Sequence, residues 1–298
     1  MLFSITKTIG LILQTPKLLL SKNAVKFYED LGDDVIEGEH AGFTDPKKPL
    51  WLNLGYWKAA RTYPEAATAM ACLLADAAQL EPGDEVLDVG FGFAEQDFLW
   101  LERYGVKHIT GINITPLHVE RANERARERG LASKLDLRIG SATEMPFAPS
   151  SFDKVTALEC AFHFDTREKF FDEAFRVLRP GGKLALADGG PAPGHKPLSF
   201  VNKIALKRWS VPVENFYDRD EYKKKLEARG FVNVSYQSIR NYVFPFCTKY
   251  GELRKKGVAQ SEAIVECTPE EIESSAWADQ WAHIGMNDYY IFSAEKPG

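Results

Sequence analysis

Residues 84–96 read DEVLDVGFGFAEQ, and this stretch decides the fold of the chain. Its largely apolar run at 86–89 is typical of a buried strand, and Gly90 and Gly92 form a turn before a helical pattern that begins at Glu95. Glycine adopts positive φ angles readily and lets a ligand lie against the backbone. A strand, a glycine turn and a helix start predict a nucleotide-type cradle at the carboxyl edge of a parallel sheet. The competing interpretation is an ordinary strand-to-helix turn in some other α/β protein.

Two carboxylates narrow the kind of ligand. The dinucleotide motif GxGxxG requires glycine at position 95, where this chain has Glu95. A carboxylate there would face a pyrophosphate, which helix starts bind through bare amide groups. Asp88 adds negative charge at the end of the strand, where a cationic ligand is favoured. S-adenosylmethionine, which carries an ammonium and a sulfonium but no phosphate, fits both features, whereas the nicotinamide dinucleotide of an oxidoreductase does not.

The composition indicates a mixed-charge globular protein. The 298 residues carry a formal net charge of −5, with a pI near 5.8, so the sequence predicts no nucleic-acid-binding surface. The four cysteines are scattered and form no CxxC pair. This spacing favours a reducing, cytoplasmic location and predicts no disulfide framework, structural zinc or other metal site.

The first residues have a composition of their own. Residues 1–26 are apolar and basic, and no acidic residue precedes Glu29. The run 9–20 is too short to span a bilayer and is interrupted by Pro16, and no small-residue cleavage pattern indicates a secretory signal. One interpretation is a helix or pair of helices packed on the body of the protein. The other is an interfacial anchor that brings the protein peripherally to a membrane or to an apolar substrate.

Around the glycine turn, strand and helix patterns alternate. Further strands are predicted at 107–113, 135–139, 152–158, 183–188, 231–242 and 288–294, and helices at 63–79, 95–103, 116–129 and 166–178. Such alternation predicts an α/β fold, in which a Rossmann-like, doubly wound, mostly parallel sheet of seven strands has helices on both faces.

The chain divides into two predicted parts. Residues 1–61 form an N-terminal helical segment and a lid loop that ends in the aromatic-rich run 51–57, and residues 62–298 form the sheet domain. The segments 190–217 and 243–286 do not belong to the sheet, and the second has a long helical pattern. Additions of this size beyond the carboxyl edge usually build substrate pockets or lids, so both are predicted to cap the site.

Polar side chains follow the predicted strands at the edge that carries the glycine turn. Asn113 ends the second strand, where ribose hydroxyls are usually bound, and the Ser-Ala pair 141–142 follows the third. Glu159 and His163 follow the fourth strand, and Asp188 ends the fifth. Because these ends meet at one edge, the side chains are expected to converge on one crevice. Each also has a structural explanation, as a packed histidine, a loop cap or an acceptor for backbone amides.

Several longer runs carry a family resemblance: EVLDVGFGFAEQDF, GINITPLHVERA, GSATEMPF, SFDKVTALECAFHF and RVLRPGGKLALAD. Together they resemble the class I S-adenosylmethionine-dependent methyltransferases, most closely the small-molecule branch of the erythromycin-type macrolide sugar O-methyltransferases. LNLGYWK at 52–58 and PVENFYDRDEY at 212–222 extend the similarity beyond the nucleoside core. The spacing of Glu159 and His163 is also similar to that in sterol C-methyltransferases and cyclopropane fatty-acid synthases.

The resemblance implies the strand order 3-2-1-4-5-7-6 and roles for individual residues. It places Gly90 and Gly92 at the methionine moiety of the cofactor S-adenosylmethionine, whose product is S-adenosylhomocysteine, and His163 and Asp188 among the catalytic groups. The other implied cofactor contacts are Tyr56, which would cover the cofactor, and Asp88, Gln96, Asn113, Ile114, His118, Ser141, Ala142 and Glu159. The chain departs from the family pattern at Ala94, where glycine is common, and at Asn113 and Ser141, where acidic residues are common.

The acceptor atom stays open between oxygen and carbon. A general base assists transfer to a hydroxyl, and a neutral histidine such as His163 suits that role, with activity falling as the pH drops through a titration near neutrality. Transfer to carbon needs aromatic faces that stabilise a developing cation. The first hypothesis is O-methylation of a bulky, largely apolar natural-product glycoside. The alternatives are C-methylation of a terpenoid, sterol or lipid, and a non-catalytic S-adenosylmethionine-binding protein.

Aromatic residues of the two cap segments are the candidate substrate contacts. An equally simple interpretation makes them the core of a helical cap. They are Phe200, Trp209, Phe216, Tyr217, Phe244, Phe246, Trp277 and Trp281.

Overall fold

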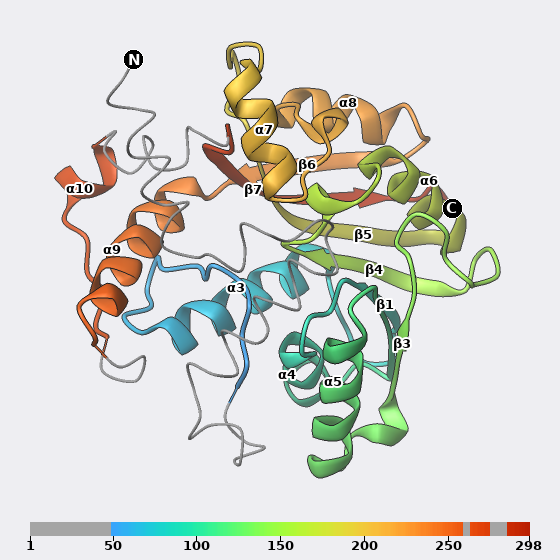
Figure 1. Cartoon of the computed structure of the whole chain (residues 1–298). Helices are drawn as coiled ribbons and strands as arrows, with labels where there is room; N and C mark the ends of the chain where they lie inside the picture. Colours follow the sequence, from blue (N-terminus) through green and yellow to red (C-terminus); the bar gives the residue numbers. More distant parts are fainter. Residues whose placement is uncertain (1–48, 259–262, 275–284) are drawn as a thin grey trace.

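The computed structural model describes residues 49–258, 263–274 and 285–298, which are built around one seven-stranded sheet (Figure 1). The strand order is β3-β2-β1-β4-β5-β7-β6, and β7 alone runs antiparallel to its neighbours. The strands are β1 (Glu85–Val89), β2 (His108–Asn113), β3 (Leu135–Ile139), β4 (Phe152–Leu158), β5 (Leu178–Gly190), β6 (Val232–Ser238) and β7 (Asp288–Glu295). The predicted doubly wound α/β fold and its strand order are therefore confirmed.

Helices cover both faces of the sheet. One face carries α3 (Tyr63–Ala78), α4 (Glu95–Arg103) and α5 (Pro116–Glu128), and the other carries α6 (Arg167–Val177) and α8 (Arg219–Glu227); Figure 1 shows the two groups on opposite sides. The alternating residues of β1 serve the two cores in turn: Val86 packs with α3 and α4, whereas Leu87 and Val89 pack with α6 and α8.

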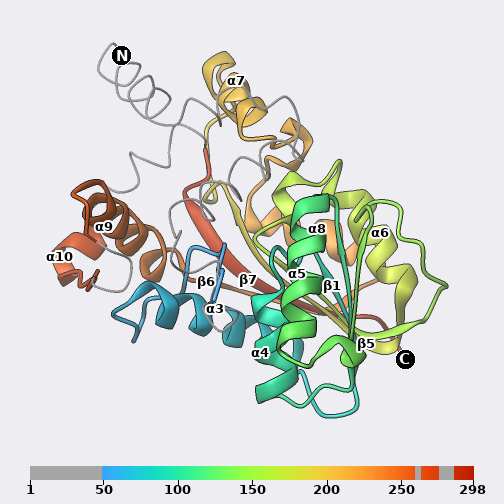
Figure 2. The same cartoon turned by 60° about the horizontal axis from the view of Figure 1, so that its bottom comes forward.

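In the described part of the chain, three helices lie outside the two covering layers. They are α7 (Phe200–Arg208), α9 (Phe244–Lys255) and α10 (Pro269–Glu273). Figures 1 and 2 both show α9 beside α3, with α10 next to α9. Aromatic contacts hold α9 there: the Tyr63 ring of α3 stacks on Tyr250 with 5.1 Å between centroids, and the Trp57 ring of the preceding loop stacks on Phe246 with 6.0 Å between centroids. Phe246 thus belongs to the core of a helical cap, which is the alternative interpretation of that aromatic residue.

Local backbone chemistry explains where the structure departs from the predicted elements. The long helical stretch expected at 243–286 is interrupted, because Gly257 takes a φ of +82° just beyond α9 and residues 263–268 are not helical. The strand expected at 231–242 ends at Ser238 and is followed by a 3-10 turn at 240–242. Helix α8 was not predicted, although Asp218 caps it by accepting hydrogen bonds from two backbone N–H groups.

Part of the predicted N-terminal organisation lies outside the described residues. This applies to the N-terminal helices, to the possible membrane-contacting segment 1–26, and to Trp277 and Trp281 of the second cap segment. In the parts of the chain that are described, no helix is both long and apolar enough to cross a membrane.

Candidate active site

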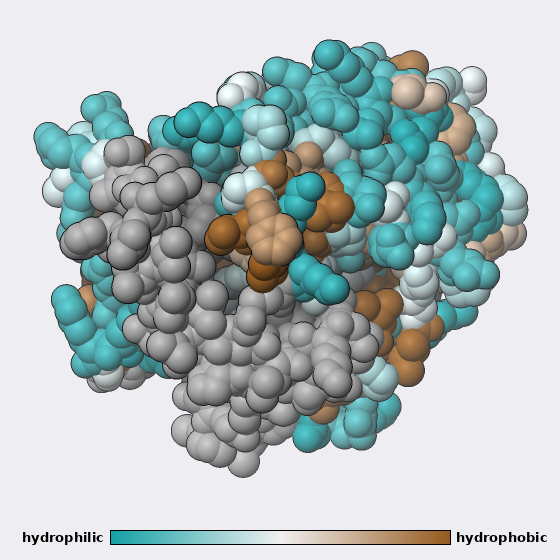
Figure 3. All heavy atoms as spheres, turned by 45° about the horizontal axis from the view of Figure 1, so that its top comes forward, coloured by the Kyte–Doolittle hydropathy of each residue, from teal (hydrophilic) through white to brown (hydrophobic). Residues whose placement is uncertain are grey.

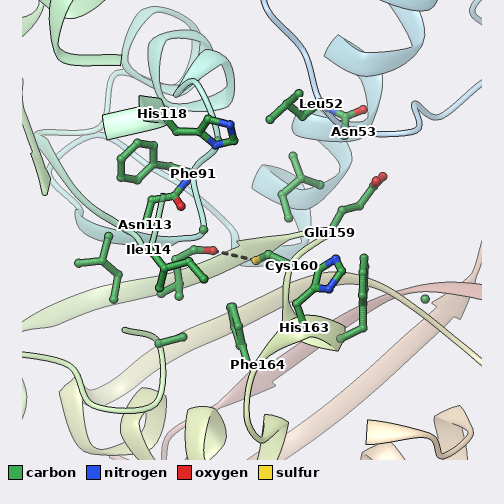
Figure 4. A pocket seen from close by; sticks show the side chains of 18 of the residues that line it. Leu52, Asn53, Phe91, Asn113, Ile114, His118, Glu159, Cys160, His163 and Phe164 are labelled. Carbon is green, nitrogen blue, oxygen red and sulfur yellow. Dashed lines mark hydrogen bonds between the residues drawn. The ribbon is translucent and has the colours of Figure 1, made fainter. Parts of the chain in front are cut away.

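A cavity of about 520 Å³ opens at the carboxyl edge of β1, β2 and β4 (Figure 4), a size typical of small-molecule sites. The glycine turn and the ends of β2, β3 and β4 form its inner wall. Tyr289 of β7 and residues from outside the sheet close it; the latter are Leu50, Leu52, Asn53, Leu54, Trp209, Val211, Phe244 and Met286. The lid loop and both predicted cap segments therefore contribute to the wall.

The glycine turn has the backbone geometry that its sequence predicts. Gly90 and Gly92 have φ angles of +80° and +58°, and Ala94 has a φ of +62°. A Cβ atom on Gly90 would lie 2.7 Å from the Cys160 Sγ atom, and one on Gly92 would lie 3.0 Å from Leu52 Cδ1. The turn thus has no room for side chains. Left-handed backbone is strained for a residue with a side chain such as Ala94, and this explains why the related family commonly has glycine at this position.

Asp88 supports the glycine turn from beneath and does not line the cavity, which corrects its prediction as a cofactor contact. The carboxylate is fully buried, and accepts hydrogen bonds from Gln96 Nε2 and Thr156 Oγ1, each at 2.8 Å. Burial raises the pKa of Asp88 to about 6. Gln96 lines the cavity and also donates to the Phe91 carbonyl at 3.1 Å. Asp88 therefore acts on the turn through Gln96.

The structure corrects the argument made from Glu95. This carboxylate turns away from the cavity and pairs with Arg125 on α5 and with Arg129 just beyond its end, so it does not face a ligand. The prediction of a cationic ligand without phosphates is still supported, by the charge of the cavity wall. Among the described residues, the lining includes Glu159 and Asp165 but no lysine or arginine. Such a wall suits a cationic ligand and lacks the cations that a pyrophosphate requires.

The five residues predicted to contact the ribose and adenine all line the cavity, namely Asn113, Ile114, His118, Ser141 and Ala142. Asn113 accepts a hydrogen bond from the Thr115 N–H at 3.1 Å through its side-chain oxygen, which orients its amide. The His118 ring packs against Phe93 with 4.5 Å between centroids. Figure 4 shows Asn113, Ile114 and His118 together on one side of the cavity.

Tyr56 does not cover the cavity, contrary to the prediction. Its N–H donates to the Ala66 carbonyl at 2.8 Å, and its ring packs edge-on against Tyr242, which holds it behind the loop. Leu52 lies over the glycine turn instead. Residue periodicity within a loop gives no indication of which side chain faces inward, so the sequence could identify the loop but not the residue.

His163 points into the cavity next to Glu159 (Figure 4). Its Nδ1 atom lies 3.0 Å from the Ser210 carbonyl oxygen. A carbonyl only accepts, so Nδ1 carries the proton in the neutral ring and Nε2 carries the lone pair. Burial lowers the pKa of His163 to about 4. The expected titration near neutrality is therefore wrong, because the ring stays neutral well below pH 7.

Asp188 does not support His163, which corrects its predicted catalytic role. The carboxylate is fully buried and does not line the cavity. It pairs with Arg167 Nε at 2.9 Å and accepts hydrogen bonds from the Tyr222 hydroxyl and the Gly189 N–H. Burial raises the pKa of Asp188, and the Arg167 guanidinium opposes that rise. Asp188 therefore anchors the end of β5 to α6 and α8.

We expect Asp188→Asn to lower the free energy of unfolding by roughly 3 kcal/mol, because Arg167 would keep a buried charge without its counterion. Urea denaturation measures this loss, and turnover per folded molecule should change little. The control is Asp136→Asn, which removes an exposed partner of Arg138 and should cost less than about 1 kcal/mol. Equal stability losses in both variants would contradict the structural role of Asp188.

Glu159 holds the lid loop against the sheet. Its carboxylate accepts from the Leu54 N–H at 2.9 and 3.1 Å and from the Tyr289 hydroxyl at 2.5 Å. Burial raises the pKa of Glu159 to about 7, and the hydrogen bond from Tyr289 opposes the rise. Glu159 also lines the cavity, so it is available to a bound ligand as well as to the loop.

The raised pKa of Glu159 gives a stability prediction. The folded state keeps its proton up to about pH 7, whereas the unfolded state releases it near pH 4.3. Stability due to this group is therefore fully present below the unfolded pKa and is lost as the pH rises to 7. We expect Glu159→Gln to be more stable than the parent at pH 8, by roughly 1 to 3 kcal/mol. Thermal melts at pH 4.5 and pH 8 check this, and a constant difference between the two would refute it.

The sequence predicted the segments that close the cavity better than the individual side chains that line it. Of the candidate aromatic contacts, Trp209 and Phe244 line the wall, whereas Tyr217 is buried beside Arg167 and Phe200 is 79% exposed. Phe162, Phe164 and Met286 were not predicted as contacts. The two phenylalanines lie in the same run as His163, so their position directly after β4 was a usable signal.

Comparisons with known proteins agree with this geometry. A family model described as a methyltransferase domain matches residues 87–186. Erythromycin 3''-O-methyltransferase of Saccharopolyspora erythraea is 38% identical over 93% of this chain and 91% of its own. The 27-O-demethylrifamycin SV methyltransferase of Amycolatopsis mediterranei is 33% identical over 74% of this chain and 84% of its own.

Solved structures share the fold. The crystal structure of the [4+2]-cyclase SpnF superposes with a TM-score of 0.68 at 21% identity, covering 93% of this chain and 97% of that one. The strand order, the glycine turn without room for side chains and the acidic cavity wall fit a nucleoside with a cationic tail. The chain belongs to the class I S-adenosylmethionine-dependent methyltransferases, and S-adenosylmethionine is its cofactor.

Proposed function

We propose that this methyltransferase transfers a methyl group to a hydroxyl group of a bulky, largely apolar natural product, with His163 as the general base. The observation that carries the proposal is the hydrogen bond from His163 Nδ1 to the Ser210 carbonyl. This bond selects the tautomer whose Nε2 atom can accept a proton. Both relatives named above also have names that refer to an oxygen-bound methyl position.

S-adenosylmethionine supplies the electrophilic methyl group when it is bound. The glycine turn, Gln96 and Asn113 are proposed to hold it at the inner wall, and the cap segments are proposed to hold the acceptor opposite. Positioning the two groups in line provides much of the rate enhancement. His163 then removes the hydroxyl proton as oxygen becomes bonded to carbon, and the Ser210 carbonyl stabilises the protonated ring through the Nδ1–H bond.

The acceptor half of the cavity favours an apolar molecule. Trp209, Val211 and Phe244 come from the cap segments, and Phe162 and Phe164 flank His163 along the chain. Aromatic and aliphatic walls bind apolar surface, and the few polar groups fix orientation. An acceptor with one hydroxyl near His163 and a large apolar body fits this distribution.

The test is a transfer assay with methyl-labelled S-adenosylmethionine and a panel of hydroxylated macrolides and their glycosides. The proposal expects labelled product whose new methyl carbon is bonded to oxygen by NMR. Cofactor binding measured in parallel separates an inactive acceptor panel from a failed cofactor site. Labelled methyl found only on carbon would overturn O-methylation.

Carbon methylation is the second candidate, and the aromatic wall supports it. Phe162, Phe164 and Trp209 offer faces that stabilise a developing carbocation, and Glu159 is a carboxylate in the same wall that could remove a proton afterwards. This candidate predicts that turnover of an alkene acceptor depends on Glu159 more than on His163. The comparison of Glu159→Gln with His163→Gln on both acceptor classes separates the two functions.

A further inference from the structure

One surface of the molecule combines exposed apolar residues with positive charge. Nine large hydrophobic residues are exposed among the described residues, and five of them lie between positions 200 and 213. We call these five the α7 patch: Phe200, Val201, Ile204, Trp209 and Val213. Figure 3 shows hydrophobic residues gathered in one cluster over α7, with hydrophilic side chains along its upper and right border. Monomeric proteins rarely leave such clusters exposed without a use.

Helix α7 carries apolar residues on its outward side as well as on its buried side. Ala205 and Leu206 face the protein and are buried, whereas Phe200, Val201 and Ile204 are 79%, 53% and 47% exposed. These three lie along one side of the helix because residues three or four positions apart share a face. The outward side is therefore not explained by packing within the described residues.

The charged residues from 189 to 213 are all basic, and the exposed Glu214 follows Val213 at the end of the α7 patch. Residues 189–213 contain four basic residues, Lys196, Lys203, Lys207 and Arg208, and no acidic residue, although the whole chain has a net charge of −5. Lys203 and Lys207 are exposed on α7 itself. A short helix that offers phenylalanine and isoleucine between lysines has the composition of segments that lie in the interface of anionic membranes.

The α7 patch continues into the cavity. Trp209 is 38% exposed and also lines the wall, and Val211 lines it two residues later. Between them, the Ser210 carbonyl holds the His163 ring. The segment that forms the outer apolar surface therefore also forms the rim of the site.

We propose that α7 and its flanks, residues 190–213, dock on an anionic lipid surface and bring the cavity rim to the interface. The lysines contact lipid headgroups, and Phe200 and Ile204 enter the boundary between headgroups and acyl chains. An anionic bilayer binds the exposed apolar side chains and the lysines at the same time. This docking goes beyond methyl transfer and does not depend on which acceptor atom receives the methyl group.

The test is co-sedimentation of the full chain with vesicles of phosphatidylcholine and phosphatidylglycerol. Lys203→Glu/Lys207→Glu should weaken partitioning by about 30-fold, since each basic residue near an anionic leaflet contributes about fivefold. Phe200→Ser/Ile204→Ser should weaken it by about 10-fold or more. The charge-matched control is Lys255→Glu/Lys256→Glu at the exposed end of α9, which should bind like the parent.

Three outcomes would overturn the proposal. One is a parent protein that does not sediment with anionic vesicles, and another is equal sedimentation of the parent and both α7 variants. The third is binding lost in the lysine variant but kept in Phe200→Ser/Ile204→Ser, which would point to an acidic partner recognised by charge alone. Unchanged S-adenosylmethionine affinity and circular dichroism show that each variant is folded.

Discussion

Gly90→Val should lower the affinity for S-adenosylmethionine by about 10³-fold, equivalent to about 4 kcal/mol. Two effects combine. A valine at a φ of +80° carries left-handed strain of about 1–2 kcal/mol. Its Cβ would also lie 2.7 Å from Cys160 Sγ, so the turn or Cys160 must move, with an overpacking cost of about 1–3 kcal/mol. Either movement disrupts the backbone cradle that holds the cofactor.

A matched glycine separates strain from site geometry. Gly130 has a φ of +70°, and a Cβ there would meet no atom within 4 Å. Gly130→Val should therefore lose stability through backbone strain while its cofactor affinity stays at the parent value. Isothermal titration calorimetry on both folded variants makes the comparison. If folded Gly90→Val protein binds S-adenosylmethionine as tightly as the parent, the glycine turn is not the cofactor cradle.

His163→Gln should lower turnover of a hydroxyl acceptor by about 10²-fold or more, because a general base contributes about 10²–10⁴-fold. Glutamine can still donate to the Ser210 carbonyl but cannot accept the proton at neutral pH. S-adenosylmethionine affinity should change little, so the loss appears in kcat. Full turnover by folded His163→Gln protein would mean that positioning alone carries the reaction.

The pH profile offers a second check on the same residue. Burial lowers the pKa of His163 to about 4, so the neutral base form is almost completely populated from pH 8 down to pH 5. We expect the contribution of His163 to turnover to stay constant over that range and to fall only as the pH approaches 4. The ratio of parent to His163→Gln rates measured against pH isolates this contribution. A fall in that ratio centred near pH 6.5 would show a solvated histidine instead.

Much of the fold could be predicted because its signals are local. The expected ranges 95–103, 135–139 and 152–158 coincide with α4, β3 and β4. Periodicity of 2 or 3.6 residues marks which face of an element is buried, and that pattern is complete within each segment. The position of Asn113, Ser141 and Ala142 at the cavity could also be predicted, because they lie at or just after the ends of parallel strands, which meet at one edge of the sheet.

The roles of two carboxylates depend on partners that are distant in the sequence, and periodicity does not reveal these partners. Asp188 looked catalytic at its strand end, but Arg167 and Tyr222 engage it in the core. Glu95 looked like a group facing the ligand, but Arg125 of α5 and Arg129 at the end of that helix pair with it. A carboxylate is stabilised by whichever donor the packed structure brings to it, and a single sequence does not reveal that donor.

The sequence by itself therefore determined the sheet, the glycine turn and the cofactor family. Only the tertiary structure decided the chemical state of the site. The tautomer of His163 depends on the Ser210 carbonyl 47 residues later, and its neutrality depends on burial by a cap that lies outside the sheet. The loop before α3 is held to the sheet by the hydrogen bond from the Leu54 N–H to Glu159, two residues that are 105 positions apart. Hydrogen-bond direction and desolvation depend on three-dimensional neighbours, and these exist only once the chain has folded.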